Sequence, residues 1–399
     1  MSPPGRPKGE LRSAQHEGTA ASRPPILPGA TLGVMGGGQL GRMFVHAAQA
    51  MGYATAVLDA DADSPAGLVA HHHIRAAYLD DAGLARLVDC SAAITTEFEN
   101  VPAGALATLG AHRPVAPGAD AVAVCQDRAA EKALFTRSGV PCAAHALVDS
   151  AERLAAVPDH LLPGILKTAR LGYDGKGQAV VADRAALAAA WQRLGSVPCV
   201  LEQKLPLALE LSVVVARGAD GTVVRLPVQQ NLHRDGILAV TQVPAPDASA
   251  ALQQQAGDCA ARLAADLVYV GVLCVEFFVT TDGRLVANEM APRPHNSGHW
   301  SIDGADVSQF DLQVRTLCGL PLVAPRQHSP AVMLNLLGDL WFATDGTERT
   351  PRWAEVLALP GAHLHLYGKA SARPGRKMGH LTLTAATPDG RCSVPSVAR

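Results

Sequence analysis

The sequence predicts a protein of mixed α/β and α+β architecture with more than one domain. Its 399 residues exceed one ordinary hydrophobic core and suit two or three domains. Hydrophobic residues make up 48% of the chain and charged residues 18%, a balance that can bury a core. Strand-like apolar runs alternate with helical segments near the N-terminus, and β-rich runs dominate further on. This order predicts a parallel sheet followed by a mixed region.

The first elements predict a Rossmann-like domain over residues 29–125. Residues 1–28 are rich in Pro, Ser, Gly and charge without hydrophobic periodicity, and they predict a flexible tail. Strands alternating with helices then imply right-handed crossovers in a parallel sheet. The predicted strands are 30–35, 53–58 and 92–96, and the predicted helices are 40–51 and 80–88.

A central domain over residues 126–320 and a small C-terminal domain over 321–399 follow. The dipeptide Asp282–Gly283 predicts a hairpin between two central strands. The last domain holds short apolar runs at 332–336 and 363–367. Central helices are predicted at 126–138, 184–194 and 248–267, and central strands at 164–167, 178–181, 197–202, 209–217, 223–228, 271–279 and 285–290.

Charge and cysteine usage exclude several classes of function. The formal net charge is -2, so no global basic field exists for nucleic acid or an anionic membrane. An anionic substrate would therefore need a local cluster of cations. The eight cysteines form no C-x-x-C pair, which argues against a zinc site or a disulfide framework. The longest apolar run, 267–279, is too short for a membrane span, and we expect a cytoplasmic protein.

Two glycine-rich loops indicate phosphate binding with different specificity. Residues 36–41 satisfy G-x-G-x-x-G after a strand, with Asp59 about 20 residues on, so a nicotinamide-dependent dehydrogenase is a rival hypothesis. A tight turn is the simpler alternative. The loop 167–178 carries three glycines and two lysines between β-like segments, and it can fold over polyphosphate. It is not a Walker loop, and a hairpin with a solvated tip remains an alternative.

Two carboxylates predict a divalent metal site. Glu276 interrupts an apolar strand, where an unpaired carboxylate is costly. The predicted hairpin would bring Glu289, on the next strand, close to it. A cation between them would offset their repulsion, and oxygen ligands beside a phosphate loop suit Mg²⁺. The alternative is that one of the two carboxylates pairs with a lysine.

A run of motifs follows in order over residues 30–383: GGGQLGRM, EFENVP, QDRAAEK, LGYDGKGQ, LEQKL, NLHRDGIL, VEFF, NEMAPRPHNSGHW, HLYGK and RPGRKMGH. Together these motifs resemble those of the N5-carboxyaminoimidazole ribonucleotide synthase family of the ATP-grasp superfamily. The resemblance implies an ATP-grasp fold with an N-terminal Rossmann-like (pre-ATP-grasp) domain, a small C-terminal domain and a homodimer. It implies ATP- and bicarbonate-dependent carboxylation of the amine of 5-aminoimidazole ribonucleotide through carboxyphosphate, in purine biosynthesis.

The resemblance also implies a nucleotide and metal site. Glu276 and Glu289 would hold Mg²⁺, with room for two ions. Lys167 would face phosphate and Glu210 the ribose hydroxyls. The full set of ATP-contacting residues would be Arg128, Lys167, Gly172, Tyr173, Asp174, Gly175, Lys176, Gly177, Gln178, Glu202, Gln203, Lys204, Leu205, Glu210, His233, Asn288 and Glu289.

The second substrate and the chemistry are assigned in the same way. Arg293 would hold bicarbonate, because a guanidinium matches a planar carboxylate. His295 could move a proton, and Asn296 lies on the same loop; a hydrogen-bonded loop histidine is the alternative for His295. The ribonucleotide would meet Gly38, Gln39, Leu40, Glu97, Tyr173 and Asp174, with its 5′-phosphate on Lys369, Arg376 and Lys377.

Three positions depart from the family pattern. Leu171 stands where many relatives carry a glycine, Thr96 stands where a tyrosine is common, and residues 387–399 are polar where relatives continue with a helical stretch. The runner-up is a formate-dependent glycinamide ribonucleotide transformylase, and the NSGHW and RPGRKMGH stretches speak against it. The dehydrogenase would leave Glu276 and Glu289 unexplained. A non-catalytic nucleotide sensor would be expected to lack one of the catalytic groups.

Overall fold

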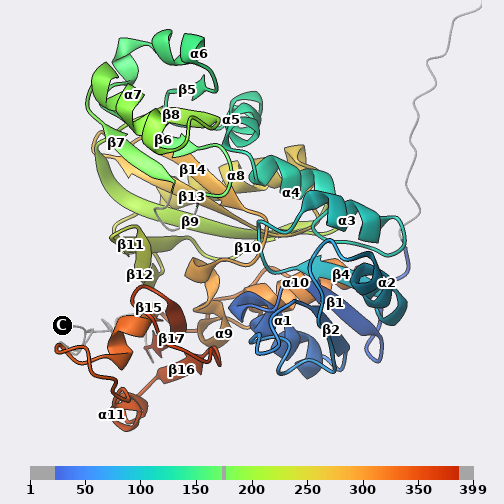
Figure 1. Ribbon diagram of the computed structural model, residues 1–399. Coiled ribbons are helices and arrows are strands. Elements are labelled where there is room, and N and C mark those ends of the chain that lie inside the picture. Colours follow the sequence, from blue (N-terminus) through green and yellow to red (C-terminus); the bar gives the residue numbers. More distant parts are fainter. Residues whose placement is uncertain (1–22, 173–176, 386–399) are drawn as a thin grey trace, which may run out of the picture.

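The computed structural model describes residues 23–172 and 177–385. The predicted site residues Tyr173, Asp174, Gly175 and Lys176 lie outside the described residues. The elements form a parallel sheet, a small antiparallel sheet and a large sheet between them (Figure 1). The chain is packed from residue 26 onward, because Ile26 N donates to Cys318 O at 2.8 Å and Tyr53 Oη donates to Ile26 O at 2.7 Å.

The N-terminal parallel sheet confirms the predicted alternation of strands and helices. Its order is β3-β2-β1-β4, and all its pairs are parallel. The sheet buries apolar residues on both faces, which is typical of parallel sheets covered by helices. The strands are β1 (Thr31–Met35), β2 (Ala54–Leu58), β3 (His72–Ile74) and β4 (Ala93–Thr96), and the helices are α1 (Gln39–Ala50), α2 (Asp81–Cys90), α3 (Ala103–Gly110) and α4 (Ala119–Cys125).

A four-stranded antiparallel sheet in the order β5-β8-β6-β7 forms the upper part of Figure 1. Helices α6 (Ala151–Ala155) and α7 (Arg184–Arg193) belong to this part, and α5 (Arg128–Arg137) joins it to the large sheet. Lys167 and Glu202 lie on neighbouring strands of this sheet, and Lys167 donates to Asn288 of the large sheet. The strands are β5 (His145–Val148), β6 (Gly164–Thr168), β7 (Gln178–Val181) and β8 (Cys199–Gln203).

The large sheet runs without a break from the central region into the C-terminal region. Its order is β14-β13-β9-β11-β12-β15-β17-β16, with β10 paired to β9. Helix α8 (Ala250–Asp266) packs its Ala256, Ala260 and Leu263 onto this sheet. The strands are β9 (Leu207–Arg217), β10 (Val223–Arg225), β11 (Gln229–Arg234), β12 (Ile237–Val243), β13 (Gly271–Thr280), β14 (Leu285–Ala291), β15 (Ala331–Leu337), β16 (Ala362–Leu366) and β17 (Lys377–Thr384).

Helix α10 (Gln309–Cys318) joins the large sheet to the N-terminal unit. Its Phe310, Val314 and Leu317 are buried in the same cluster as Phe44 of α1. A capping box at Ser308 begins the helix, and Gly319 in the left-handed region ends it. Its sequence carries these signals, but α10 is not among the helices predicted from the sequence. Short helices α9 (Ser301–Gly304) and α11 (Trp353–Leu357) complete the fold.

The hairpin β11–β12 was also missed. Its turn residues Asp235 and Gly236 both have positive φ, 51° and 77°. An Asp-Gly pair with this geometry is the preferred turn of a two-residue hairpin, so the Asp-Gly pair in HRDGIL was the available signal. No helix among residues 23–172 and 177–385 is long and apolar enough to cross a membrane.

Candidate active site

The two predicted metal carboxylates lie directly opposite each other. Glu276 of β13 pairs with Glu289 of β14, within the hairpin whose turn was predicted at Asp282–Gly283. The side chain of Glu276 is only 14% exposed. Burial and the nearby charge of Glu289 raise the pKa of Glu276 to about 7. Two facing acidic groups in a buried site with oxygen donors fit Mg²⁺, which carries the compensating charge.

Glu289 differs from Glu276 because cations surround it. Arg128 Nη1 lies 2.9 Å from Glu289 Oε2. Burial acts to raise the pKa of Glu289, but the charges of Arg128 and Lys167 outweigh it, so the pKa is lowered. The pair is therefore asymmetric, with an ionised Glu289 and a Glu276 that retains its proton more readily.

Two lysines pair with Glu202 and also donate to Asn288, the residue before Glu289. Lys167 Nζ lies 2.9 Å from Glu202 Oε2 and donates to Asn288 Oδ1 at 3.3 Å. Lys132 Nζ lies 3.1 Å from Glu202 Oε1 and donates to Asn288 O at 2.8 Å. The pKa of Glu202 is lowered because these two charges outweigh its burial. Lys132 lies in the motif QDRAAEK but is not among the predicted site residues. Its complete burial is the signal of a required counter-ion.

The described ends of the predicted phosphate loop lie beside α5. Leu171 and Gly177 both have positive φ, 62° and 72°. Arg128 N donates to Ala169 O at 2.9 Å, so the strand that leads into the loop meets the N-terminus of α5. The left-handed backbone at Leu171 explains why a glycine suits this position, because a side chain there is strained.

The residues expected at the nucleoside end lie on β8, β9 and β11. Glu210 of β9 pairs through Oε2 with Nδ1 of His233 on β11. Burial opposes protonation of His233, but the hydrogen bond to Glu210 and the charge of Glu276 raise the pKa of the imidazole. The extended backbone of Gln203 and Lys204 is held by bonds to Ala144 O and Pro163 O, and Leu205 is half-buried beside them.

The first glycine loop is filled by acidic side chains of its own domain. Gly38 N and Gly41 N donate to the two oxygens of Glu97 at 2.9 and 3.2 Å, and burial raises the pKa of Glu97. Gly37 N donates to Asp59 Oδ2 at 2.7 Å. A carboxylate therefore occupies the helix N-terminus where a dinucleotide would place its pyrophosphate. This arrangement argues against the dehydrogenase hypothesis.

A local cation cluster lies in the segment between β16 and β17. Lys369 Nζ donates to Lys377 O at 2.7 Å, and Arg376 Nη1 donates to Ser371 O at 2.6 Å. Burial and the charge of Arg376 lower the pKa of Lys369 to about 8, while the charge of Glu97 acts in the opposite sense. Lys377 in turn acts on the pKa of Glu276. Gly368, next to Lys369, lies against Arg42 of α1, the helix that begins with Gln39 and Leu40 after the first glycine loop.

The three predicted catalytic residues fall in one buried loop with different contacts. Arg293 Nε pairs with Glu99 Oε2, and Nη1 donates to Pro294 O at 3.0 Å. His295 Nε2 lies 3.1 Å from Glu276 Oε1. The amide of Asn296 exchanges two hydrogen bonds with Asn335 of β15, at 2.9 and 2.7 Å. Glu99, within EFENVP, was not predicted, and only its partner Arg293 reveals its place.

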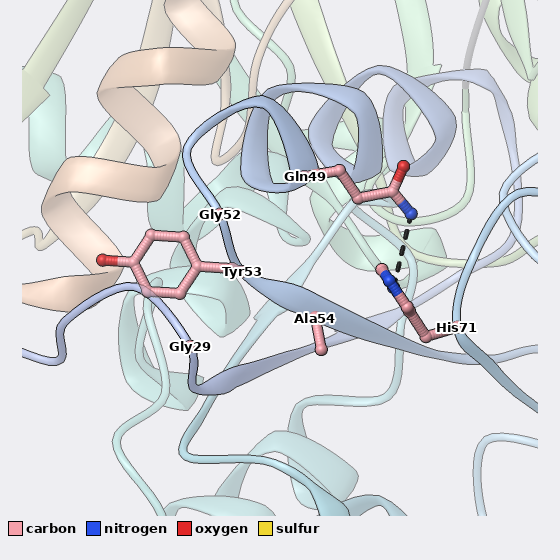
Figure 2. Close-up of a pocket in the computed structure, with 6 residues that line it drawn as sticks. All are labelled: Gly29, Gln49, Gly52, Tyr53, Ala54 and His71. Atoms are coloured by element: carbon pink, nitrogen blue, oxygen red, sulfur yellow. Dashed lines mark hydrogen bonds between the residues drawn. The ribbon is translucent and has the colours of Figure 1, made fainter.

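The histidine run at 71–73 does not gather metal ligands. His71 Nδ1 lies beside Gln49 Nε2 at 3.5 Å, in a surface hollow of about 460 Å³ that Figure 2 shows. His71 also accepts from Thr55 N at 3.2 Å, and His73 contacts Ser64 Oγ. These bonds tie β3 and the residue before it to α1, to β2 and to the loop at Ser64, so the run is structural.

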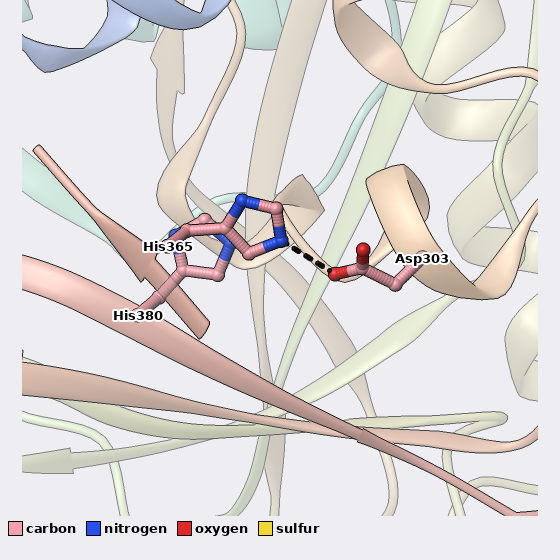
Figure 3. A group of neighbouring side chains, drawn as sticks. All are labelled: Asp303, His365 and His380. Carbon is pink, nitrogen blue, oxygen red and sulfur yellow. Dashed lines mark hydrogen bonds and ion pairs between the residues drawn. The ribbon is translucent and has the colours of Figure 1, made fainter. Parts of the chain in front are cut away.

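The one group of three potential metal ligands among the described residues is Asp303, His365 and His380. His365 Nε2 lies 2.9 Å from Asp303 Oδ2. The rings of His365 and His380 are stacked 4.4 Å apart at 12° (Figure 3). The lone pairs of two parallel, stacked rings cannot point at one ion at normal zinc distances. The group instead joins β16 and β17 to α9.

Comparison with known proteins agrees with this geometry. Three family models match in order: the ribonucleotide synthetase preATP-grasp domain over residues 29–126, the ATP-grasp domain over 133–310, and the phosphoribosylaminoimidazole carboxylase C-terminal domain over 331–390. The chain is 41% identical over 362 residues to the N5-carboxyaminoimidazole ribonucleotide synthase of Bacillus subtilis, covering 90% of this chain and 93% of the relative. It is 44% identical over 360 residues to that of Brucella melitensis, covering 90% and 97%.

Solved structures give the same result. A crystal structure of an N5-carboxyaminoimidazole ribonucleotide synthetase in complex with ADP superposes with a TM-score of 0.85 at 40% identity, over 92% of this chain and 95% of that one. The Aspergillus clavatus synthase in complex with ADP and 5-aminoimidazole ribonucleotide gives 0.80 at 32% identity, over 90% and 94%.

The fold and the site define an ADP-forming ligase of the ATP-grasp class, which confirms the predicted fold class. More particularly, the chain belongs to the N5-carboxyaminoimidazole ribonucleotide synthase family, as its motifs predicted. The alignment with the Bacillus subtilis relative covers 90% of the chain, so it includes the regions of all three family models.

Proposed function

We propose that the chain carboxylates the amine of 5-aminoimidazole ribonucleotide at the expense of ATP and bicarbonate, in purine biosynthesis. One observation carries the proposal: Gly368, next to Lys369, lies against Arg42 of α1, while the charge of Glu97 acts on Lys369 and the charge of Lys377 acts on Glu276. This arrangement supports a site for a phosphorylated amine beside a site for phosphoryl transfer. Family membership supports the same reaction.

ATP would bind between the small antiparallel sheet and the large sheet. Lys167 and Arg128 would bind its phosphates, because Arg128 pairs with Glu289 and Lys167 donates to the neighbouring Asn288. The phosphate loop from Gly172 to Gln178 would cover them. Glu210 would accept the ribose hydroxyls, and His233, which pairs with Glu210, would also contact ATP. The adenine would be bordered by Glu202, Gln203, Lys204 and Leu205.

Glu276 and Glu289 would hold Mg²⁺, in one or two ions, with Asn288 beside them. When bound, Mg²⁺ neutralises charge on the transferring phosphoryl group. Arg128 and Lys167 keep Glu289 ionised for this purpose, and Lys132 balances Glu202 when Lys167 turns to phosphate. Without Lys132, that shift would leave a buried carboxylate unpaired.

Arg293 would hold bicarbonate and the carboxyphosphate that forms when a bicarbonate oxygen attacks the γ-phosphate of ATP. Glu99 fixes the Nε edge of Arg293, which orients the remaining guanidinium N–H groups. His295 and Asn296 lie on the same loop. The amine of the ribonucleotide, facing Glu97, would then capture the activated carboxyl group.

The 5′-phosphate of the ribonucleotide would lie on Lys369, Arg376 and Lys377, with Gly38, Gln39 and Leu40 beside its ribose and Tyr173 and Asp174 at its border. We also propose the domain limits 29–125, 126–320 and 321–399, a homodimer, and a place in the cytoplasm. ATP, bicarbonate and the ribonucleotide are the proposed partners, with no nucleic acid and no membrane.

The test is ADP release from purified protein with Mg²⁺, ATP and bicarbonate, with and without the ribonucleotide. We expect strong stimulation by the ribonucleotide and its loss in Glu289→Gln. Asp282→Asn, at the exposed turn of the same hairpin, is the matched control and should keep the stimulation. Absence of stimulation in folded protein would refute the assigned substrate.

A further inference from the structure

Two successive residues of β14 face the same cations. Lys167 donates to Asn288 Oδ1 at 3.3 Å, and Arg128 Nη1 lies 2.9 Å from Glu289 Oε2. Burial opposes it, but the charges of Arg128 and Lys167 together lower the pKa of Glu289. In a regular strand, successive side chains point to opposite faces of the sheet. An irregularity in β14 must therefore bring the side chains of Asn288 and Glu289 to one side.

The pairing of β13 with β14 contains this irregularity. Glu276 pairs with Glu289, but the next residue of β13, Phe277, pairs with Ala287. Asn288 is therefore an extra residue, and Asn288 and Glu289 together lie opposite Glu276 in a β-bulge. A bulge bends its strand and redirects a side chain, which is why bulges are frequent next to active sites. Here the bulge accounts for two neighbouring side chains at one group of cations.

Helix α5 supplies hydrogen-bond partners for the outer edge of the bulge. Strand β14 is an edge strand of the large sheet, so the backbone groups on its outer side need partners from elsewhere. Lys132 Nζ donates to Asn288 O at 2.8 Å, and Met290 N donates to Glu131 Oε1. Glu131 and Lys132 are both buried. Two consecutive residues of one helix therefore bind the backbone on either side of Glu289.

We propose that Glu131 and Lys132 are positioning residues that hold the bulge of β14, so that Asn288 and Glu289 both face the site of phosphoryl transfer. The inference rests on the proposed function for the roles of Asn288 and Glu289. Helix α5 also carries Arg128, so one helix pairs with Glu289 and fixes the strand that presents it. Loss of the bulge would shift the register of β14 by one residue, and such a shift turns side chains to the other face of a sheet.

The contact made by Glu131 requires an acceptor oxygen rather than a charge. Burial raises the pKa of Glu131 to about 7, against the charges of Lys132 and Arg128. A carboxyl group keeps an acceptor oxygen for the N–H of Met290 in either protonation state. Glutamine supplies the same oxygen without a charge, and alanine supplies none. The variants Glu131→Gln and Glu131→Ala therefore separate the effect of the hydrogen bond from the effect of the charge.

The first test measures the hydrogen bond without metal or turnover. Hydrogen exchange of the Met290 amide is followed by NMR in isotopically labelled protein. We expect a protected amide in the unmodified protein and in Glu131→Gln, and exchange about 10-fold faster in Glu131→Ala. The amide of Ala287 is the internal control, because it donates to Pro141 O at 2.7 Å and should keep its protection. An unprotected Met290 amide in the unmodified protein, or equal acceleration of both amides, would overturn the proposal.

The second test measures the metal site. The affinity for Mn²⁺ in the presence of a non-hydrolysable ATP analogue is obtained from the electron paramagnetic resonance signal of free Mn²⁺. We expect Glu131→Ala to weaken binding about 10-fold or more, and Glu131→Gln to weaken it by about threefold at most. Tyr269→Phe is the matched control, because it removes a buried hydrogen bond to Val272 O at the beginning of β13 and should leave the affinity unchanged. Equal weakening in both Glu131 variants, or none in either, would refute the positioning role.

The two measurements also separate the positioning role from the proposed function. In one outcome, Glu131→Ala changes both the exchange of the Met290 amide and the affinity for Mn²⁺, but ADP release does not respond to the ribonucleotide. That outcome would refute the proposed substrate and leave the role of Glu131 standing.

Discussion

Replacing Glu276 by Gln should stabilise the metal-free protein at pH 8 while abolishing its activity. Burial and the charge of Glu289 raise the pKa of Glu276 from an ordinary value of 4.5 to about 7. At roughly 1.4 kcal/mol per pKa unit, this corresponds to about 3 kcal/mol of destabilisation when Glu276 is fully ionised. Contact of the ionised carboxylate with water and with His295 reduces this destabilisation. We therefore expect Glu276→Gln to raise the free energy of unfolding by about 1–2 kcal/mol. Glutamine is close to glutamate in size and shape, so the substitution removes the charge and keeps the packing.

The pH dependence of this gain follows from linkage. A carboxyl whose pKa is higher in the folded state binds its proton more tightly there. Below pH 4.5 the group is protonated in both states, so it does not lower the free energy of unfolding. The cost grows between pH 4.5 and about 7 and is complete at pH 8. The difference in free energy of unfolding between Glu276→Gln and the unmodified protein should therefore be small at pH 5 and largest at pH 8.

Glu289→Gln provides the matched comparison with the opposite sign. Arg128 and Lys167 lower the pKa of Glu289, so removing its charge leaves these cations unbalanced. Because the Glu289 side chain is 40% exposed, we expect a loss of about 1 kcal/mol or less. Urea unfolding followed by circular dichroism in EDTA at pH 5 and pH 8 measures both. A Glu276→Gln protein that is less stable than the unmodified protein at pH 8, or a difference that does not change with pH, would refute this reasoning.

Three further predictions concern other parts of the site. The Michaelis constant for the ribonucleotide should rise above pH 8, where Lys369, with a pKa of about 8, loses its charge; steady-state kinetics should show this rise without a parallel rise for ATP, and a flat profile would contradict it. Lys132→Met should lower the free energy of unfolding by about 2–3 kcal/mol and raise the Michaelis constant for ATP, because Lys167 must then stay with Glu202. Unfolding and kinetic measurements that match the unmodified protein would contradict the counter-ion role. Leu171→Gly should raise the free energy of unfolding by about 0.5 kcal/mol, because relief of the strained φ of 62° outweighs the entropy gained by the unfolded chain. Thermal unfolding should show no such gain for the control Leu171→Ala.

The sequence predicted most of the elements because their signals are local. The alternation of strands and helices before residue 96 and the hairpin at Asp282–Gly283 need only the period of apolar residues and one turn. The same hairpin placed Glu276 opposite Glu289. Helix α10 and the hairpin β11–β12 carried equally local signals, a capping box and an Asp-Gly turn, and were overlooked.

Other features could not be read from local pattern. The continuation of the large sheet from β12 into β15 joins residues almost a hundred positions apart, and no local signal records that pairing. Glu99 is an ordinary acidic residue until Arg293, from another part of the chain, lies beside it. Lys132 looks like any helical lysine until its burial against Glu202 is known. Such roles depend on tertiary contacts.

The central claim, that bicarbonate is activated as carboxyphosphate for transfer to the ribonucleotide amine, is tested most directly with ¹⁸O-bicarbonate. The purified protein is given Mg²⁺, ATP, the ribonucleotide and labelled bicarbonate, and the released phosphate is examined by ³¹P NMR. The account predicts one ¹⁸O atom in each phosphate formed together with the carboxylated ribonucleotide. Phosphate released without ¹⁸O would show that water or another acceptor attacks ATP, and it would contradict the account.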